Sequence, residues 1–374
     1  MASVSCLQTA TAGRAGSNME ALSLTKTDWE ERMLAWGQPV YRAAQVLEWI
    51  YQRRIRNWQE MSNLPAVLRE RLEKEFPAAR LVKIRETGAR DTTRKFLFRL
   101  ADGQLIESVL IPASPALYGE ASDRRTICIS SQVGCAYGCK FCASGLEGWK
   151  RNLTAGEIVD QFLQVEAESG EKINNIVFMG MGEPMANYDN LLRAIGILNA
   201  PWGVGVGARH MTVSTSGLVP RIRELGEQPL QVRLAISFHG ATDEVRGRIM
   251  PVNKKYPVEE LLAACEDYVR LKKQRLTFEF ILIRDINDSP EQARLLANQA
   301  RRVNAKVNLI PYNTVEGLEW DRPDDSRQEA FLKILQNAGT EATLRREKGH
   351  DIAAACGQLR LQVEKSVAQT SVLI

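Results

Sequence analysis

The segment Thr126–Cys142 reads TICISSQVGCAYGCKFC and joins a strand-forming run to three closely spaced cysteines. Its first part, Thr126–Ser130, has the apolar and β-branched residues typical of a strand. Cys135, Cys139 and Cys142 follow with C-x3-C-x2-C spacing, so the loop after this strand carries three thiols. The segment therefore predicts that a site for chemistry lies directly after the strand.

Strand-like and helix-like runs alternate downstream of this segment. The strand-like runs are Thr126–Ser130, Asn175–Met179, His210–Ser214, Arg233–Ser237, Thr277–Ile283 and Lys306–Ile310. The helical runs are Thr154–Ser169, Asn187–Leu198, Val219–Leu225, Val258–Leu271, Pro290–Val303 and Arg327–Ala338. Such alternation is typical of a parallel sheet, so we expect an α/β fold built around a partial (βα)6 barrel over residues 121–345. Functional side chains then gather at the carboxyl ends of the strands.

The chain outside the barrel divides into four segments. Residues 26–80 have helical periodicity and predict a helical, RNA-binding accessory domain. Residues 81–120 hold two alternating runs joined by Ala101-Asp102-Gly103, which predicts a β-hairpin and a linker. Residues 1–25 are rich in Ala, Ser and Thr and predict a disordered tail rather than a targeting peptide. Residues 346–374 form a separate C-terminal segment.

The composition is ordinary for a soluble chain, but the charge is uneven. The 374 residues are 44% hydrophobic, and no run of 18 apolar residues occurs, so we expect no membrane-spanning helix. The net charge is +4, whereas residues 40–100 hold 14 Lys and Arg against 7 Asp and Glu. A basic region on a near-neutral body favours a polyanionic partner such as RNA, although a solvated charged face gives the same pattern.

The cysteine pattern indicates a metal site rather than a disulfide framework. There are seven cysteines, an odd number, and three lie within eight residues, which favours a reducing, cytoplasmic compartment. Three thiolates leave one iron of a [4Fe–4S] cluster open to chelate the amino and carboxylate groups of S-adenosylmethionine (SAM), as in radical SAM enzymes. Phe141, before the last cysteine, is also typical of that superfamily. Zinc is the weaker alternative, because it favours four protein ligands.

Polar residues at other strand ends suit a SAM site. Gly180-Met181-Gly182-Glu183-Pro184 follows the second strand, where glycine lets the backbone approach a ligand and Glu183 could accept a hydrogen bond from the SAM amino group. The further polar strand ends are Ser214-Thr215-Ser216-Gly217, Ser237-Phe238-His239 and Asn313. Each alone is a common turn, but several facing one barrel mouth favour ligand binding.

These motifs resemble the RlmN/Cfr group of radical SAM RNA methyltransferases over nearly the whole chain after about residue 25. Other matching segments are Tyr41-Arg42-Ala43-Ala44-Gln45, Ile106-Glu107-Ser108-Val109, Ser130-Ser131-Gln132-Val133-Gly134-Cys135 and Gly349-His350-Asp351-Ile352-Ala353-Ala354-Ala355-Cys356-Gly357-Gln358-Leu359. The last segment is the most specific. Its Gly349–Ile352 part is more similar to the adenine-C2 enzymes than to the adenine-C8 resistance enzymes.

The resemblance implies a role for each matching position. SAM contacts fall on Gly182, Glu183, Ser214, Ser237, Phe238, His239 and Asn313, and the cluster ligands on Cys135, Cys139 and Cys142. Cys356 is implied as the cysteine that carries the methyl group, Cys128 as the resolving cysteine that forms a transient disulfide with it, and Glu107 as the proton acceptor. Cys6 and Cys265 receive no role, and Cys265 is expected in the core.

The implied reaction is methylation of adenine C2 in 23S rRNA, at the peptidyl-transferase centre, and in tRNA, next to the anticodon. C2 lies between two ring nitrogens and is too electron-poor to attack a sulfonium methyl group, so the carbon must arrive as a radical. One SAM methylates Cys356, and a second SAM generates the radical that activates the S-methyl group. A monomer reduced by an electron donor such as flavodoxin is expected.

Three alternatives remain open from the sequence. The chain could methylate adenine C8, as the Cfr-type enzymes do. It could be a radical SAM enzyme of another reaction class, such as an activase that forms a glycyl radical, which has no need for Cys128 and Cys356. It could also be a non-enzymatic iron–sulfur protein that binds RNA, which would form no deoxyadenosine from SAM and a reductant.

Overall fold

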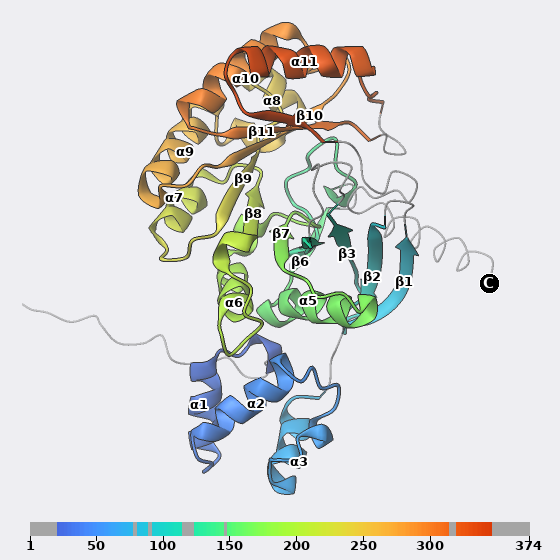
Figure 1. Cartoon of the computed structure of the whole chain (residues 1–374), viewed down its shortest axis with the longest axis vertical. Helices are drawn as coiled ribbons and strands as arrows, with labels where there is room; N and C mark the ends of the chain where they lie inside the picture. The colour runs from blue at the N-terminus through green and yellow to red at the C-terminus, as the bar shows by residue number, and fades with distance from the viewer. Residues whose placement is uncertain are drawn as a thin grey trace, which may run out of the picture.

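One mixed sheet of ten strands organises the chain (Figure 1). The computed structural model describes residues 21–77, 81–88, 92–113, 123–145, 148–313 and 319–345. Seven adjacent strands are parallel: β4 (Arg125–Cys128), β7 (Asn175–Phe178), β8 (Met211–Thr215), β9 (Arg233–Ser237), β10 (Thr277–Leu282), β11 (Lys306–Pro311) and β12 (Ala342–Leu344). The predicted α/β fold is confirmed, and β12 adds one parallel strand to the six expected.

Helices cover the outer face of the parallel strands (Figure 1). They are α5 (Ala155–Ser169), α6 (Tyr188–Asn199), α7 (Val219–Glu227), α8 (Asp243–Ile249), α9 (Val258–Lys272), α10 (Pro290–Arg302) and α11 (Asp325–Asn337), with short 3-10 turns at Ala143–Gly145, Pro184–Asn187, Ala208–His210 and Pro251–Lys254. Side-chain caps begin several of them: the Thr154 hydroxyl accepts from Glu157 N, and Ser289 and Asp324 cap α10 and α11. No described helix is long and apolar enough to cross a membrane.

The predicted hairpin is present, and it is part of the main sheet. Strands β2 (Arg94–Arg99) and β3 (Leu105–Pro112) are antiparallel, and β3 pairs with β4 so that Val109 lies opposite Cys128. An additional strand, β1 (Val82–Gly88), forms the edge beyond β2. The sequence did not reveal β1, because its apolar signal is limited to Val82 and Ile84, and the strand is almost entirely exposed, with no buried face.

The N-terminal helices form a small domain with its own aromatic core. They are the 3-10 turn Ala21–Ser23, α1 (Lys26–Ala35), α2 (Tyr41–Tyr51), the 3-10 turn Trp58–Glu60 and α3 (Ala66–Glu75). Trp29 is fully buried against Phe76, with ring centroids 5.2 Å apart. The domain lies against α5 and α6 (Figure 1). Gly156 N at the start of α5 donates to Ser23 Oγ over 2.7 Å, and Gln52 Nε2 donates to Gly203 O over 2.9 Å.

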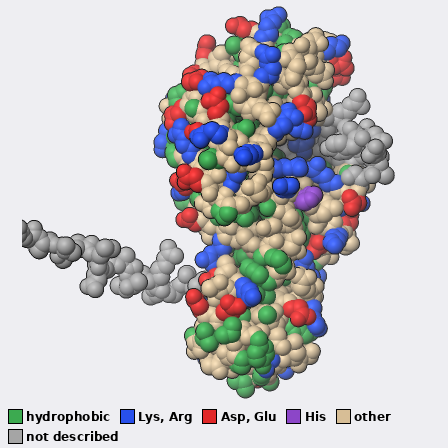
Figure 2. All heavy atoms as spheres, turned by 60° about the vertical axis from the view of Figure 1, so that its left-hand side comes forward, with side chains coloured by type: hydrophobic (Ala, Val, Ile, Leu, Met, Phe, Trp, Pro, Cys, Tyr) green, Lys and Arg blue, Asp and Glu red, His purple; other side chains and the backbone are tan. Residues whose placement is uncertain are grey.

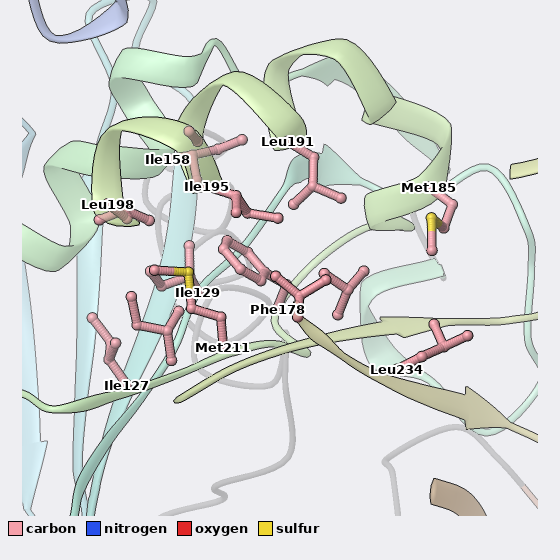
Figure 3. Close-up of a cluster of buried hydrophobic side chains, with 14 of the residues drawn as sticks. Ile127, Ile129, Ile158, Phe178, Met185, Leu191, Ile195, Leu198, Met211 and Leu234 are labelled. Atoms are coloured by element: carbon pink, nitrogen blue, oxygen red, sulfur yellow. The ribbon is translucent and has the colours of Figure 1, made fainter. Parts of the chain in front are cut away.

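The main core lies between the sheet and α5–α6 (Figure 3). Ile127 and Phe178 come from β4 and β7, and Ile158, Leu191 and Ile195 meet them from the two helices. All five are fully buried. This packing fixes strands β4 and β7, which carry the chain into the cysteine loop and into the Gly182 turn, so both segments start from rigid positions.

Candidate active site

A cavity of about 360 Å³ opens at the carboxyl ends of the parallel strands. The three thiols of the cysteine loop line it, together with six of the seven residues expected to contact SAM: Gly182, Glu183, Ser214, Ser237, His239 and Asn313. The exception is Phe238, whose ring is fully buried and stacks on Phe278 with centroids 4.4 Å apart. Phe238 therefore gains no support from its side chain as a SAM contact, and its role stays a prediction.

The cysteine loop is bracketed by a two-stranded ribbon of β5 (Gln132–Gly134) and β6 (Trp149–Asn152). Gly134 has φ +72°, and a Cβ there would lie 1.9 Å from Gly148 O, so only glycine fits. Cys135 N donates to Gly148 O over 3.1 Å, and Lys140 N donates to Ile249 O over 3.0 Å. These bonds tie the loop to the ribbon at one end and to the end of α8 in its middle.

The environment of the three thiols favours binding of a positively charged metal group. Burial raises the pKa of Cys135 to about 12, and burial together with the nearby Cys142 and Cys135 raises the pKa of Cys139. Bare thiolates are therefore disfavoured here, whereas iron would compensate them. Among the described residues, no three His, Cys, Asp or Glu side chains converge as a single ion requires. All three thiols nevertheless line one cavity, and this is the feature that favours a shared multi-iron cluster.

Glu183 links the ends of two strands from a fully buried position. Its Oε1 accepts from Met185 N over 3.0 Å and its Oε2 accepts from Ser216 N over 2.7 Å. Burial raises the pKa of the carboxyl, and the Ser216 hydrogen bonds oppose that rise. Gly182 before it has φ +93°, and a Cβ there would lie 2.4 Å from the Gln132 Cβ. The carboxylate is thus fixed at the cavity wall, where an ammonium group of a ligand would complete its charge balance.

His239 is a neutral imidazole at the cavity wall. Its Nδ1 accepts from Ile281 N over 3.1 Å, which leaves the proton on Nε2. Burial and the Arg246 charge lower its pKa to about 3. Its φ is +57°, and its ring meets Phe141 edge-on at 4.7 Å. The aromatic residue of the cysteine motif is therefore in contact with the end of β9.

Cys128 and Glu107 lie on one face of the β3–β4 pair but at different depths. Cys128 is buried and lines the cavity, as does Val109 opposite it. Glu107, two residues before Val109 on β3, is 3% exposed and does not line the cavity. The Lys95 ammonium, fully buried, lies 3.1 Å from Glu107 Oε2. The expected base is thus a buried carboxylate that is ion-paired with Lys95 and does not itself line the cavity. Cys356 lies outside the described residues.

Sequence reasoning missed Lys95 and three further polar residues. Glu279 and Arg345 line the cavity, and Arg246 is fully buried beside it. Glu279 accepts from Asn308 Nδ2 over 3.0 Å, and burial raises its pKa. The Phe-Glu-Phe alternation of β10 was a signal for it, because a strand with Phe278 and Phe280 in the core directs residue 279 to the barrel interior. For Arg246, whose partners lie in three separate segments, we find no local signal.

Comparison with known proteins agrees with this site. Residues 129–297 match the family model described as radical SAM superfamily, and residues 19–77 match the ribosomal RNA large subunit methyltransferase N-terminal domain. A crystal structure of a radical SAM methyltransferase from Sphaerobacter thermophilus superposes with a TM-score of 0.85 at 44% identity, covering 91% of this chain and 98% of that chain.

Two curated relatives are similar over nearly their whole length. The probable dual-specificity RNA methyltransferase RlmN of Akkermansia muciniphila is 53% identical over 351 residues, 93% of this chain and 98% of its own. The dual-specificity RNA methyltransferase RlmN of Syntrophobacter fumaroxidans is 46% identical over 337 residues, 90% of this chain and 96% of its own.

A three-cysteine loop after the first parallel strand, facing polar ends of the following strands, defines a radical SAM enzyme. At the identities and coverage given above, the chain belongs to the RlmN family of radical SAM RNA methyltransferases.

Proposed function

We propose that this enzyme methylates C2 of adenine in 23S rRNA, at the peptidyl-transferase centre, and in tRNA, next to the anticodon. The observation that carries the proposal is the position of Cys128. This thiol is not part of the cysteine motif, yet it lines the same cavity as Cys135, Cys139 and Cys142. A radical SAM reaction that only cleaves SAM has no use for a fourth thiol there, whereas methyl transfer through Cys356 requires one.

The cavity residues fit a cluster and SAM. Cys135, Cys139 and Cys142 would hold a [4Fe–4S] cluster, and the six lining residues named above would contact SAM. When bound, the two cofactors supply a carbon radical by reductive cleavage of SAM, and a flavodoxin-like donor would provide the electron. The buried Glu183 carboxylate would orient the SAM ammonium, and the apolar part of the wall, such as Val109 and Ile111, would exclude water from the reacting carbon.

The chain's own residues would carry the methyl transfer. The Cys356 thiolate takes a methyl group from one SAM, so each turnover consumes two SAM molecules. After the methylene radical has bonded to C2, the adduct would pass its unpaired electron back to the iron–sulfur centre, and Glu107, held by its ion pair with Lys95, would accept the C2 proton. The Cys128 thiolate then attacks the Cys356 sulfur, and the bond from sulfur to the methylene carbon breaks with its electron pair left on that carbon. A proton completes the methyl group, and a disulfide remains. We propose that a single chain, acting as a monomer, suffices.

Isotope-labelled RNA tests the regiochemistry. Reconstituted enzyme, SAM and reductant would be incubated with a 23S rRNA fragment or a tRNA whose adenosines carry deuterium at C2, and in parallel at C8. Mass spectrometry of the nucleosides should show methyladenosine that has lost the C2 deuterium and kept the C8 deuterium. The reverse loss would establish the Cfr-type reaction instead, and SAM cleavage without any methylated RNA would favour another radical SAM reaction class.

A further inference from the structure

Arg246 of α8 is a fully buried cation that has only neutral partners. Its Nε donates to Phe238 O over 3.1 Å, and its terminal nitrogens donate to Asn253 Oδ1 over 2.9 Å and to Ser216 O over 2.5 Å. Among the described residues, no carboxylate oxygen pairs with it directly. The Asp243 carboxylate reaches it only through Asn253, whose Nδ2 donates to Asp243 Oδ1 over 2.9 Å.

Two glycines let the surrounding backbone approach Arg246 closely. A Cβ on Gly217 would lie 3.0 Å from a terminal nitrogen of Arg246, and a Cβ on Gly240 would lie 2.6 Å from its backbone nitrogen. Both glycines follow strand ends that line the cavity. A cation enclosed without a counter-charge is strongly unfavourable, so a site built around one indicates that a negative group binds next to it.

The cysteine loop is the place from which that negative charge would come. Lys140 N, next to Cys139 in the loop, donates to the carbonyl of Ile249, the last residue of α8. Ser216, whose carbonyl accepts from Arg246, lines the same cavity as Cys139 and Cys142. The guanidinium is therefore anchored to the wall of the cavity that the cluster ligands line.

We propose that Arg246 is the counter-cation of the iron–sulfur cluster: it holds the ends of β8 and β9 in place and makes the cluster easier to reduce. Three thiolates give a bound cluster a net negative charge, and reduction increases that charge. A fixed cation nearby stabilises the reduced state more than the oxidised state, which raises the reduction potential. The inference rests on the cluster and not on the RNA specificity, so a failure of C2 methylation would leave it intact.

Redox titration of the reconstituted full-length enzyme, without SAM or RNA, tests the proposal. The midpoint potential would be followed through the electron paramagnetic resonance signal of the reduced cluster. Arg246→Gln keeps a hydrogen-bonding side chain without the charge and should shift the potential to lower values, whereas Arg246→Lys should stay near the wild-type value. Arg270→Gln, a change on the surface of α9, is the matched control and should leave the potential unaltered. Cys139→Ala should hold no intact cluster.

A second variant, which is expected to shift the reduction potential in the opposite direction, tests the proposal if Arg246→Gln does not assemble a cluster. Asp243→Asn removes the carboxylate that reaches Arg246 through Asn253 and should raise the potential. Equal potentials in Arg246→Gln and the wild type would overturn the proposal, as would equal shifts in the Gln and Lys variants. Should Arg246→Gln fail to load and Asp243→Asn leave the potential unchanged, the proposal also falls. A shift seen only after SAM is added would assign the cation to the SAM carboxylate instead.

Discussion

Glu107 is held in place by a buried ion pair. Its side chain is 3% exposed, and the fully buried Lys95 ammonium lies 3.1 Å from Glu107 Oε2. Removing one partner of such a pair leaves the other charge uncompensated. Lys95→Met should therefore lower the rate of RNA methylation by at least about 100-fold, the range that general-base catalysis spans. Cluster iron and SAM cleavage in the absence of RNA should persist, since Lys95 does not line the cavity. Initial rates of methyl incorporation measure the effect.

A double variant separates this positioning role from mere stability. If Lys95 acts through Glu107, then Lys95→Met combined with Glu107→Gln should be no slower than Glu107→Gln alone. Lys95→Arg should restore part of the activity, because it returns the charge. Wild-type methylation by Lys95→Met would show that Glu107 is not the ionised base of the proposed mechanism.

His239 predicts a particular pH dependence of stability. Because its pKa of about 3 in the folded chain lies below the ordinary 6.5, the unfolded chain binds one proton more between these pH values. Its contribution to stability is complete above pH 6.5 and falls towards pH 3, by about 1.4 kcal/mol per pH unit. His239→Asn, which tolerates the positive φ, should flatten this acid slope in urea unfolding between pH 7 and 4. The exposed His210→Asn should not change it.

At the scale of elements, the Gly134 turn decides whether the cysteine loop can close. Gly134→Ala would place a Cβ 1.9 Å from Gly148 O and force a side chain into the left-handed region, which alone costs about 1–2 kcal/mol. We expect the β5–β6 ribbon to open and the iron content after reconstitution to fall to a small fraction of the wild-type value. Gly170→Ala has a similar φ of +69° but open space around it, so it should bind iron normally. Equal iron in both variants would contradict this role of the ribbon.

The elements that the sequence predicts are those with a local signal. Caps and amphipathic periodicity predict the helices α5, α10 and α11. Short apolar runs between turns predict the strands β4, β7, β8, β9, β10 and β11. Strand β1 has only a weak signal of this kind, because it is an exposed edge strand held by its pairing with β2. The joining of the hairpin to β4 is also a long-range event. It brings Val109 opposite Cys128, and no periodicity within either segment encodes that register.

In the candidate site, too, the sequence predicted the residues that have a local signal and missed those that do not. Motif spacing and the family resemblance located the cysteines and most of the strand-end residues, because each lies in a short contiguous segment. Lys95 and Arg246 lie outside these motifs, so the sequence did not indicate that they are buried charged residues near the site. Their burial depends on partners elsewhere in the chain. The residue type alone does not show whether a Lys or Arg side chain is buried or solvated.

At the scale of the whole molecule, the packing of the N-terminal domain on the barrel gives Arg54 a different environment from Arg53 and Arg56. Arg54 donates to Glu166 Oε2 of α5 over 2.6 Å and so joins the domain to the barrel. Arg53 and Arg56 are exposed, and Arg53 stacks on Trp49 at 4.2 Å. Figure 2 shows that apolar side chains gather over this end of the molecule, and Leu34, Val40, Tyr41 and Val67 are the exposed ones. We therefore expect the phosphate contacts of the predicted RNA-binding domain to come from individual cations between apolar areas.

Charge reversal should separate these groups. If Arg53 or Arg56 contacts a phosphate, its change to Glu should reduce the slope of log binding constant against log salt by about 0.7–0.9. Arg54→Glu faces Glu166 instead and should lower the thermal midpoint of unfolding. Binding of the RNA substrate at several salt concentrations, with melting curves for each variant, measures both effects. An unchanged slope for Arg53→Glu and Arg56→Glu would remove these residues from the RNA surface.

The proposed mechanism also spans the whole molecule, since Cys128 is on the first parallel strand and Cys356 is in the C-terminal segment. The two cysteines should therefore fail differently. Cys356→Ala has no thiolate to accept the first methyl group, so it should give neither methylated protein nor methylated RNA, although its cluster still assembles. Cys128→Ala keeps the acceptor and the radical step but lacks the resolving thiol.

Cys128→Ala should therefore stall after carbon–carbon bond formation, with RNA attached to the protein through Cys356. Such an adduct should survive denaturing gel electrophoresis, and nuclease digestion should reduce it to one modified nucleotide on the C-terminal peptide. Cys265→Ala is the matched control, because that cysteine is fully buried in α9 and lies outside the cavity lining, so it should turn over without trapping RNA. Normal turnover by Cys128→Ala would remove its resolving role. Methylated RNA from Cys356→Ala would exclude the two-cysteine scheme altogether and favour a radical SAM reaction that attacks the base directly.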